Sequence, residues 1–336
     1  MVTQQDVADR AGVGRRTVSH VVTGFPYVSA EVRERVLQAI DELGYVPNRA
    51  AQQLRTGRSG VIALTVPEIG VGYFGELGTL VVEEAAARGL GTVLARTRGA
   101  RDGELTELER ILALQPDGVI LSPLGLTPAD LAAIAARVPV ALIGEHLLGV
   151  AADAPGVRPI AIDNAAAASE IVAHLVERGR RRIAYIGTAG PEPRFNALRR
   201  EGARAGRAAA GLEEVADIEL HDFTWEEGHR AGAEAARRVR SGELDAVFCV
   251  TDEVAIGAMR ALHDAGLRIP DDVAVAGFDD IPEGRYAMPR LTTVAPDKPE
   301  IARRAVAAVL GEEPAPGPVP HTFVPRESTL GAPSRG

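Results

Sequence analysis

The sequence predicts an all-α unit over residues 1–58, followed by a larger α/β unit that contains two doubly wound parallel sheets. Apolar residues recur at helical spacing up to Leu43, and glycines stand where short helices would end. From Val61 onward, short apolar runs typical of strands alternate with amphipathic runs typical of helices. These runs are too numerous for one ordinary sheet, so we expect two subdomains.

The first two predicted helices lie within residues 3–22. Thr3 with Asp6 is a helix-start signature, because the hydroxyl caps free amides and the carboxylate suits the positive helix end. Gly12 suits the left-handed backbone of a tight turn. The inward-facing residues at helical spacing are Val7, Ala8, Ala11, Val13, Val18, Val21 and Val22. The outward-facing residues of the second helix are Arg15, Arg16, Thr17, Ser19 and His20. This arrangement predicts a helix-turn-helix.

A third helix is predicted between a capping Ser29 and a terminating Gly44. Its apolar stripe consists of Val32, Val36, Ile40 and Leu43. In the segment 48–55, Asn48 can cap a helix over residues 49–55, but these seven residues make under two turns. We expect it to fold only against a partner.

The residue order DVAxxAGVxxxTVSxVV from Asp6, followed by VSxxxRERVLxAIxELGYxPNxxAQQL from Val28, resembles the LacI/GalR family of bacterial transcriptional repressors. The matching spans the whole chain. The resemblance implies a homodimer that binds palindromic double-stranded operator DNA and responds to a small-molecule effector, expected to be a sugar. It implies the DNA-binding residues Thr3, Arg15, Arg16, Thr17, Ser19, His20, Asn48, Ala51, Leu54 and Arg55. The segment 48–55 would be the hinge helix of a DNA-binding domain over residues 1–58.

Charge is divided unevenly along the chain. The total net charge is −9, but residues 1–58 contain eight Arg against six Asp or Glu. This gives the N-terminal segment a charge of +2 and the remainder −11, which suits a DNA-binding head on an acidic body. Lys298 is the only lysine.

Several classes of protein are disfavoured by composition. The N-terminus carries Asp6 and Asp9 where a signal peptide would be apolar, and no apolar run is long enough to span a bilayer. We therefore expect a soluble, cytoplasmic protein without membrane association. Cys249 is the only cysteine, so disulfides within the chain and thiolate metal clusters are excluded, and we expect no cofactor.

The α/β unit contains a series of predicted strands. They are Val61–Val66, Gly91–Arg96, and the runs DGVILS, PVALIG, RRIAYIG, DAVFCV and VAVAGFD. The family resemblance implies a periplasmic-binding-protein-like core over residues 59–336. Its N-subdomain would cover about 61–158 and 297–318, and its C-subdomain about 159–294 and 320–332. No helix is predicted after Leu330, so a dimer rather than a tetramer is expected.

Polar and aromatic side chains follow the carboxyl ends of these strands, where ligands of open parallel sheets bind. Arginine and carboxylates can each span two adjacent hydroxyl groups, and an aromatic ring covers the apolar face of a sugar. Arg199 heads an R-x-x-G motif and Asp279 lies in a G-F-D-D motif, both of which the family uses for its effector. The predicted effector-binding residues are Tyr73, Phe74, Ser122, Glu145, Arg199, Phe223, Thr251 and Asp279.

A G-x-G-x-x-G run at Gly70–Gly75 leaves a nucleotide-dependent enzyme open as an alternative. A dinucleotide site would place the first glycine directly at the strand end and an acid after the next strand. Here three residues intervene, and the next strand closes on Arg96 and Arg98, which would suit only a 2′-phosphate. No metalloprotease or serine-hydrolase motif is present, so we predict no enzyme. A sugar-binding protein without DNA function is the other alternative, and the helix-turn-helix disfavours it.

Overall fold

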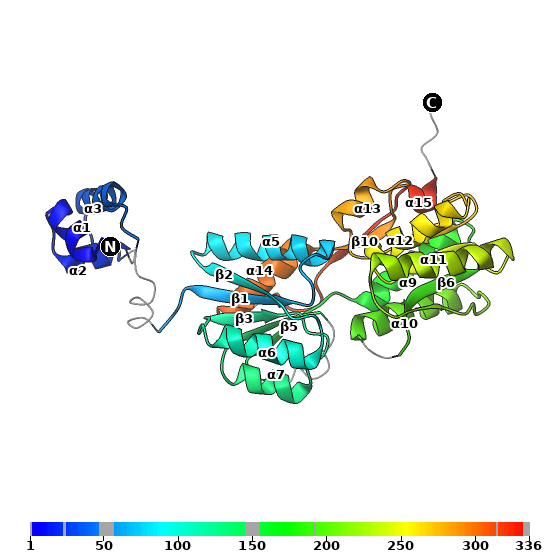
Figure 1. Ribbon diagram of the computed structural model, residues 1–336, viewed down its shortest axis with the longest axis horizontal. Helices are drawn as coiled ribbons and strands as arrows, with labels where there is room; N and C mark the ends of the chain where they lie inside the picture. The colour runs from blue at the N-terminus through cyan, green and yellow to red at the C-terminus, as the bar shows by residue number, and fades with distance from the viewer. Residues whose placement is uncertain are drawn as a thin grey trace, which may run out of the picture. The chain divides into compact units, whose positions relative to one another are not determined.

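The computed structural model describes residues 2–22, 25–46, 57–144, 155–190, 193–313 and 315–331. The chain divides into two compact units, Met1–Gly60 and Val61–Gly336. The first unit is all-helical and the second is α/β (Figure 1), which confirms the expected fold class.

The first unit contains the three expected helices, α1 (Gln4–Ala11), α2 (Arg15–Val22) and α3 (Ala30–Leu43). The Thr3 hydroxyl accepts a hydrogen bond from the Asp6 amide, and the Asp6 carboxylate accepts from the Thr3 amide, which completes a capping box. Gly12 ends α1 with φ 65°, in the left-handed region that favours glycine. The fully buried core includes Val7, Ala8, Val18 and Val36.

The second unit begins with a five-stranded parallel sheet in the order β2-β1-β3-β4-β5. Its strands are β1 (Val61–Val66), β2 (Gly91–Arg96), β3 (Gly118–Leu121), β4 (Val140–Ile143) and β5 (Val157–Ile160). The helices α5 (Gly72–Ala87) and α14 (Lys298–Val309) cover one face, and α6 (Arg101–Leu112) and α7 (Pro128–Ala135) cover the other (Figure 1). Neighbouring residues of β1 alternate between these faces: Ile62 packs in the cluster with α5, and Ala63 packs in the cluster with α6.

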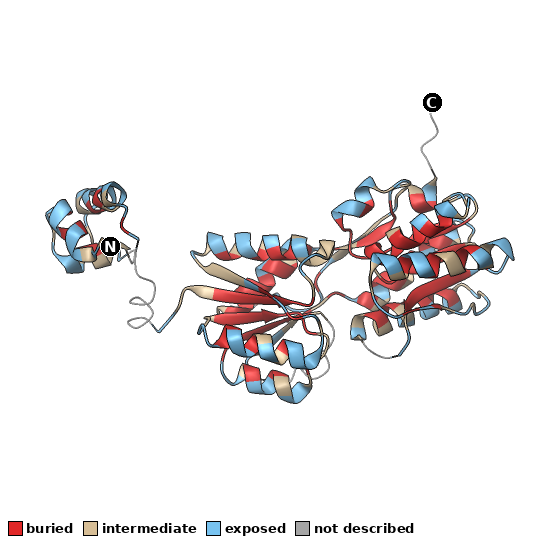
Figure 2. Cartoon of the chain, in the orientation of Figure 1, coloured by how far each residue is buried: buried red, intermediate tan, exposed pale blue. Residues whose placement is uncertain are grey.

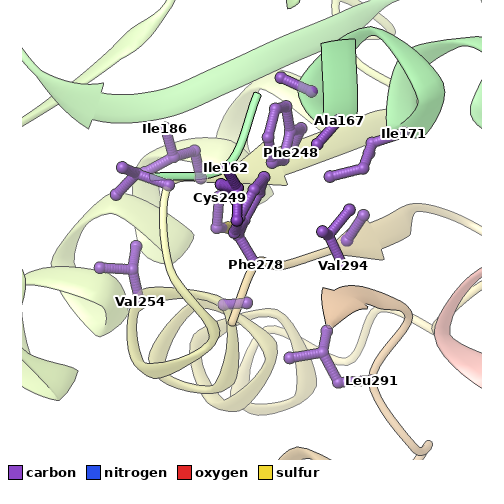
Figure 3. Packing of buried hydrophobic residues seen from close by; sticks show 14 of the residues in the cluster. Ile162, Ala167, Ile171, Ile186, Phe248, Cys249, Val254, Phe278, Leu291 and Val294 are labelled. Carbon is purple, nitrogen blue, oxygen red and sulfur yellow. The ribbon is translucent and has the colours of Figure 1, made fainter. Parts of the chain in front are cut away.

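A second, four-stranded parallel sheet has the order β7-β6-β8-β9. Its strands are β6 (Ile183–Thr188), β7 (Ile218–Leu220), β8 (Ala246–Cys249) and β9 (Ala274–Ala276). Its helices are α9 (Asn164–Glu177), α10 (Arg194–Ala209), α11 (Trp225–Arg240), α12 (Asp252–Asp264) and the short α13 (Pro282–Tyr286) and α15 (Glu327–Leu330). Phe248, Phe278 and Ile186 pack in its core (Figure 3), and buried residues concentrate in the strands and on the inner helix faces (Figure 2).

Glycines allow the helices of the second subdomain to pack in close pairs. A Cβ atom at Gly202 of α10 would overlap the carbonyl oxygen of Ala165 in α9. A Cβ atom at Gly228 of α11 would overlap the carbonyl oxygen of Val254 in α12. Both helix pairs therefore depend on the absence of a side chain at the crossing point.

The chain passes between the two sheets where β10 (Thr293–Pro296) pairs antiparallel with β11 (His321–Val324). The sequence did not predict β10 or β5. The expected subdomain boundary after Arg158 falls inside β5, which pairs with β4 as far as Ile160. None of the described helices is long and apolar enough to cross a membrane.

Candidate functional site

One face of α2 is available for contact with a partner. Arg15 and Arg16 at its start are exposed, and Val18 and Val21 on its opposite face are buried. The other predicted DNA-binding residues of this helix, Thr17, Ser19 and His20, are half-buried. Two adjacent guanidinium groups at the start of an exposed helix provide bidentate donors for guanine edges or phosphates.

Two aromatic residues that the sequence did not single out extend this face. The His20 ring lies 4.5 Å from the Phe25 ring, and the Phe25 ring lies 5.5 Å from that of Tyr27. Tyr27 is 87% exposed. Because its phenol can donate a hydrogen bond, the end of this stack is a further candidate contact for a phosphate.

Five of the predicted site residues lie outside the described residues. They are Asn48, Ala51, Leu54 and Arg55 of the proposed hinge segment, and Glu145 of the proposed effector site.

A cavity of about 590 Å³ lies between the carboxyl ends of the two sheets. It is lined by residues from both subdomains. The structure brings seven predicted residues together there: Tyr73, Phe74, Ser122, Arg199, Phe223, Thr251 and Asp279. A cavity of this volume accommodates a ligand of small-molecule size.

Arg199 forms the polar floor of this cavity. Its Nε donates to Asn164 Oδ1 at 2.7 Å, Nη1 to the Val250 carbonyl oxygen at 2.6 Å, and Nη2 to Asp279 Oδ1 at 3.2 Å. The guanidinium also lies over the Phe278 ring, 3.6 Å from its centroid. These bonds account for three of the five N–H groups of the guanidinium.

Asp279 belongs to a turn with an unusual backbone. Asp279 has φ 110° and Asp280 has φ 47°, values that side-chain-bearing residues rarely adopt. Buried Asp252 holds this turn, because its carboxyl accepts from the Ile281 amide at 2.9 Å and from the Thr293 hydroxyl at 2.7 Å. Burial raises the pKa of Asp252 well above its ordinary value, and the nearby Asp279 raises it further. The hydrogen bonds of buried Asp252 therefore stabilise the unusual backbone conformation of this turn.

Glu253 is a cavity residue that the sequence analysis missed. Its side chain is buried, and Oε1 accepts from the Gly72 amide at the start of α5 at 3.2 Å. This bond joins the second subdomain to the first. Burial raises the pKa of the Glu253 carboxyl from 4.5 to about 7. Its position directly after Asp252, in the first turn of α12, gave no separate signal.

Aromatic rings line both walls of the cavity. Tyr73 and Phe74 contact each other at 5.2 Å on the first subdomain, and Phe195 and Phe223 contact each other at 5.2 Å on the second. The sequence predicted three of these rings and missed Phe195. It also missed Trp225, the only tryptophan of the chain, which lines the cavity from the start of α11.

The cavity carries more acidic than basic groups. The carboxylates are Glu68, Asp222, Glu226, Glu253 and Asp279, and the guanidinium groups are those of Arg96, Arg98 and Arg199. Two arginines are already paired with carboxylates, Arg96 with Glu68 at 2.7 Å and Arg199 with Asp279. Among the described residues, no group of His, Cys, Asp or Glu is placed to hold a metal ion.

The glycine run Gly70–Gly75 contacts the other subdomain rather than forming an open cradle. A Cβ atom at Gly72 would lie 2.9 Å from Glu283 Oε2 and 3.2 Å from Ile281 Cβ. The glycine therefore permits close approach of the two subdomains. This packing gives a reason for the glycine that does not involve a nucleotide.

A helix-turn-helix joined to a two-sheet core with a polar and aromatic cavity defines a ligand-responsive DNA-binding regulator. Residues 3–48 match the model for bacterial regulatory proteins of the lacI family, and residues 172–329 match that for a periplasmic binding protein-like domain. The HTH-type transcriptional regulator CelR of Thermobifida fusca is 38% identical over 94% of both chains. The chain belongs to the lacI family of bacterial regulatory proteins and is a DNA-binding transcription regulator.

Solved structures agree with this assignment. The lac repressor dimer bound to operator and the anti-inducer ONPF has a TM-score of 0.79, with 26% identity over 98% of this chain and 99% of that one. A complex of the transcriptional regulator CelR with cellobiose has a TM-score of 0.67, with 31% identity over 98% of this chain and 100% of that one. The relatives are regulators rather than enzymes, so they do not support the alternative of a nucleotide-dependent enzyme.

Proposed function

We propose that this protein is a homodimeric repressor whose affinity for a palindromic operator is controlled by an uncharged sugar bound in the cavity between its two subdomains. The observation that supports a sugar effector is the pair of Arg199 and Asp279 on the lining of the cavity. It places a guanidinium group and a carboxylate side by side on the lining of a cavity whose two walls carry aromatic rings. Sugars need both kinds of contact, because their hydroxyls are polar and the C–H faces of their rings are apolar.

The charge of the cavity supports a neutral effector. Apart from the Arg96–Glu68 and Arg199–Asp279 ion pairs, the cavity is lined by the acidic side chains of Asp222, Glu226 and Glu253 and by one guanidinium group, that of Arg98. A sugar phosphate or a sugar acid would add a negative charge to this acidic excess. Repulsion between like charges in a partly buried site is costly. Cellobiose, the ligand in the related CelR structure, is a neutral disaccharide and therefore a reasonable first probe.

In this proposal α2 reads the operator. Arg15 and Arg16 approach base edges in the major groove, and Thr17, Ser19 and His20 contact bases or phosphates beside them. Thr3 lies at the start of α1, where the free amides of a helix favour a phosphate. Asn48, Ala51, Leu54 and Arg55 would contact the centre of the operator through the proposed hinge helix. The protein would act in the cytoplasm, where operator DNA lies, and would not act as an enzyme.

The only tryptophan allows ligand binding to be measured without DNA. Trp225 lines the cavity, so its fluorescence should change when a ligand binds. We would titrate the full-length protein with cellobiose, maltose, glucose 6-phosphate and gluconate, and follow binding of DNA from its own promoter region by fluorescence anisotropy.

A neutral sugar is expected to change both signals, and the two anions neither. Ser122→Ala, on the first subdomain, should weaken the ligand response and leave DNA binding unchanged. Preferential binding of glucose 6-phosphate or gluconate would exclude the neutral-effector proposal. Failure to bind any DNA from the promoter region would count against the repressor itself.

A further inference from the structure

Lys298 is the only lysine in a chain with 37 basic Lys and Arg residues, and it is almost completely buried. It opens α14, which packs on the first sheet beside α5. The side chain is 3% exposed, whereas most charged side chains in proteins lie at the surface. A buried ammonium group needs strong partners, because its desolvation is otherwise costly.

The partners of Lys298 come from both subdomains. Its Nζ donates to Glu76 Oε2 of α5 at 2.5 Å and to the carbonyl oxygen of Asp280 at 3.0 Å. Nζ also lies 5.7 Å from the centroid of the Tyr73 ring. Glu76 and Tyr73 belong to the first subdomain, and Asp280 belongs to the turn after β9 in the second. The ammonium group therefore bridges the junction between them.

Two of these contacts lead to walls of the cavity. Tyr73 lines the cavity from the first subdomain, and Asp280 is the direct neighbour of Asp279, which lines it from the second. Lys298 itself is not among the described residues that line the cavity. A ligand that moves Asp279 or Tyr73 would consequently alter the surroundings of the ammonium group without touching it.

The geometry suits lysine better than arginine. An ammonium group is a compact charge with three donors that can point in different directions, whereas a guanidinium group is a wide planar fork. The neighbours here lie in different directions: Glu76 and Tyr73 are on α5, and Asp280 is on the turn after β9. This gives a physical reason why a chain that uses arginine at every other basic position has lysine here.

A second contact lies at the same junction. The Gly72 amide at the start of α5 donates to Glu253 of the second subdomain. The first turns of α5 are thus held by two groups, Glu253 at the amide end and Lys298 through Glu76 one turn further. Any change in the angle between the subdomains has to alter these contacts.

We propose that Lys298 is the positioning residue that couples occupation of the cavity to the relative placement of the two subdomains. It acts through Glu76 on α5 and through the peptide of Asp280 on the turn that carries Asp279. This role rests on the proposed function for its link to operator affinity. The bridge between α5 and the turn stands independently of that function.

The first experiment requires no effector. Hydrogen exchange of the full-length protein would compare wild type with Lys298→Met, which keeps the length of the side chain and removes the charge. Amides in residues 72–78 and 279–282 should exchange about tenfold faster in this variant, because both segments lose a shared partner. Arg303→Met is the matched control: Arg303 lies on the same helix and pairs within it to Glu300.

Glu76→Gln tests whether the two residues act as one unit. If they do, the double variant with Lys298→Met should exchange no faster than Lys298→Met alone, whereas independent effects would add. Unchanged exchange in Lys298→Met, acceleration confined to one of the two segments, or additive effects in the double variant would overturn the proposal.

The second experiment measures coupling. Trp225 fluorescence reports binding of cellobiose or another neutral sugar that the wild type binds, and operator anisotropy reports DNA affinity with and without it. Lys298→Met should bind the sugar within about threefold of wild type, while the sugar's effect on operator affinity falls by about tenfold. An unchanged effect would overturn the proposal. If the wild type binds none of the sugars, the proposed function fails, and the exchange experiment alone decides the role of Lys298.

Discussion

Arg199 supports the fold as well as the candidate ligand site, because its three hydrogen bonds join α9, the residue after β8 and the turn that carries Asp279. Removing it leaves the buried Asp279 carboxylate without its cation. We expect Arg199→Ala to lower the free energy of unfolding by about 3–5 kcal/mol, the usual effect of breaking a buried pair. Chemical denaturation would measure this, with Arg204→Ala at an exposed position of the same helix as the control. Equal stability of the two variants would contradict this role.

Glu253 should make stability depend on pH. Its folded pKa of about 7 lies above the unfolded value of 4.5, so the folded state binds the proton more tightly. The resulting stabilisation is present below about pH 4.5 and is lost as the pH rises to about 7. Glu253→Gln cannot ionise, so relative to wild type it should gain up to about 3 kcal/mol between pH 4 and pH 8.

Denaturation at both pH values would test this, and Glu226→Gln is the control because Glu226 lines the same cavity in an exposed position. A difference between Glu253→Gln and wild type that is the same at pH 4 and pH 8 would show that the carboxyl does not titrate in this range.

The sequence predicted the cavity residues that directly follow strands, and it missed those that lie at the starts of helices. Ser122, Thr251 and Asp279 follow buried strands, and the carboxyl ends of parallel strands meet at one edge of a sheet. Phe195, Trp225 and Glu253 sit in the first turns of helices. Which of several exposed side chains in a first turn points into a cavity depends on helix orientation, and that is set by packing between distant segments.

At the scale of secondary-structure elements, we make a prediction about the role of α2 in operator binding. Arg16→Ala should weaken operator binding by about 1–3 kcal/mol and relax the base preference at one position of each half-site. Arg35→Ala on α3 removes the same charge from an exposed position outside α2 and should leave the base preference unchanged. A selection from randomised operators would measure both. An unaltered preference in Arg16→Ala would remove this residue from base reading.

Close helix pairing makes a second prediction at this scale. Gly202→Ala would force a methyl group against the Ala165 carbonyl, and we expect a loss of about 1–3 kcal/mol in the free energy of unfolding. Gly75→Ala in α5 meets nothing closer than the Ile69 carbonyl oxygen at 3.7 Å and should stabilise the protein by about 0.5–1 kcal/mol. If Gly202→Ala lowers the free energy of unfolding and Gly75→Ala raises it, the effect of helix packing is distinguished from the effect of helix propensity. Two changes of the same sign would refute the packing argument.

Long elements with regular periodicity were predicted well, and short crossover elements were not. The capping box of α1 and the terminating Gly44 of α3 were readable because each depends on local chemistry. The strands β10 and β11 contain Pro296 and half-exposed residues, and their facing residues are 25 to 31 positions apart in the sequence. Their pairing depends on two subdomains lying beside each other, which no local pattern encodes.

At the scale of the whole molecule, the proposed homodimer directs attention to two exposed apolar side chains on the second subdomain. Tyr286, the last residue of α13, is 85% exposed, and Met288 in the loop that follows is 95% exposed. We expect Tyr286→Asp to shift the protein from dimer to monomer in sedimentation velocity and to weaken operator binding, since a palindrome needs two heads. Ala133→Asp at an exposed position of α7 adds the same charge elsewhere and should remain dimeric. A fully dimeric Tyr286→Asp would exclude this loop from the interface.

The buried position of Cys249 in β8 has a practical consequence for following motion in this molecule. Its thiol is fully enclosed, and burial raises its pKa, so reagents that attack thiolates have no access to the only native cysteine. Spin labels attached to two introduced cysteines, one on α7 and one on α11, would therefore report without background. The distribution of distances between them would reveal directly whether a sugar draws the two sheets together, opens them, or leaves their separation unchanged.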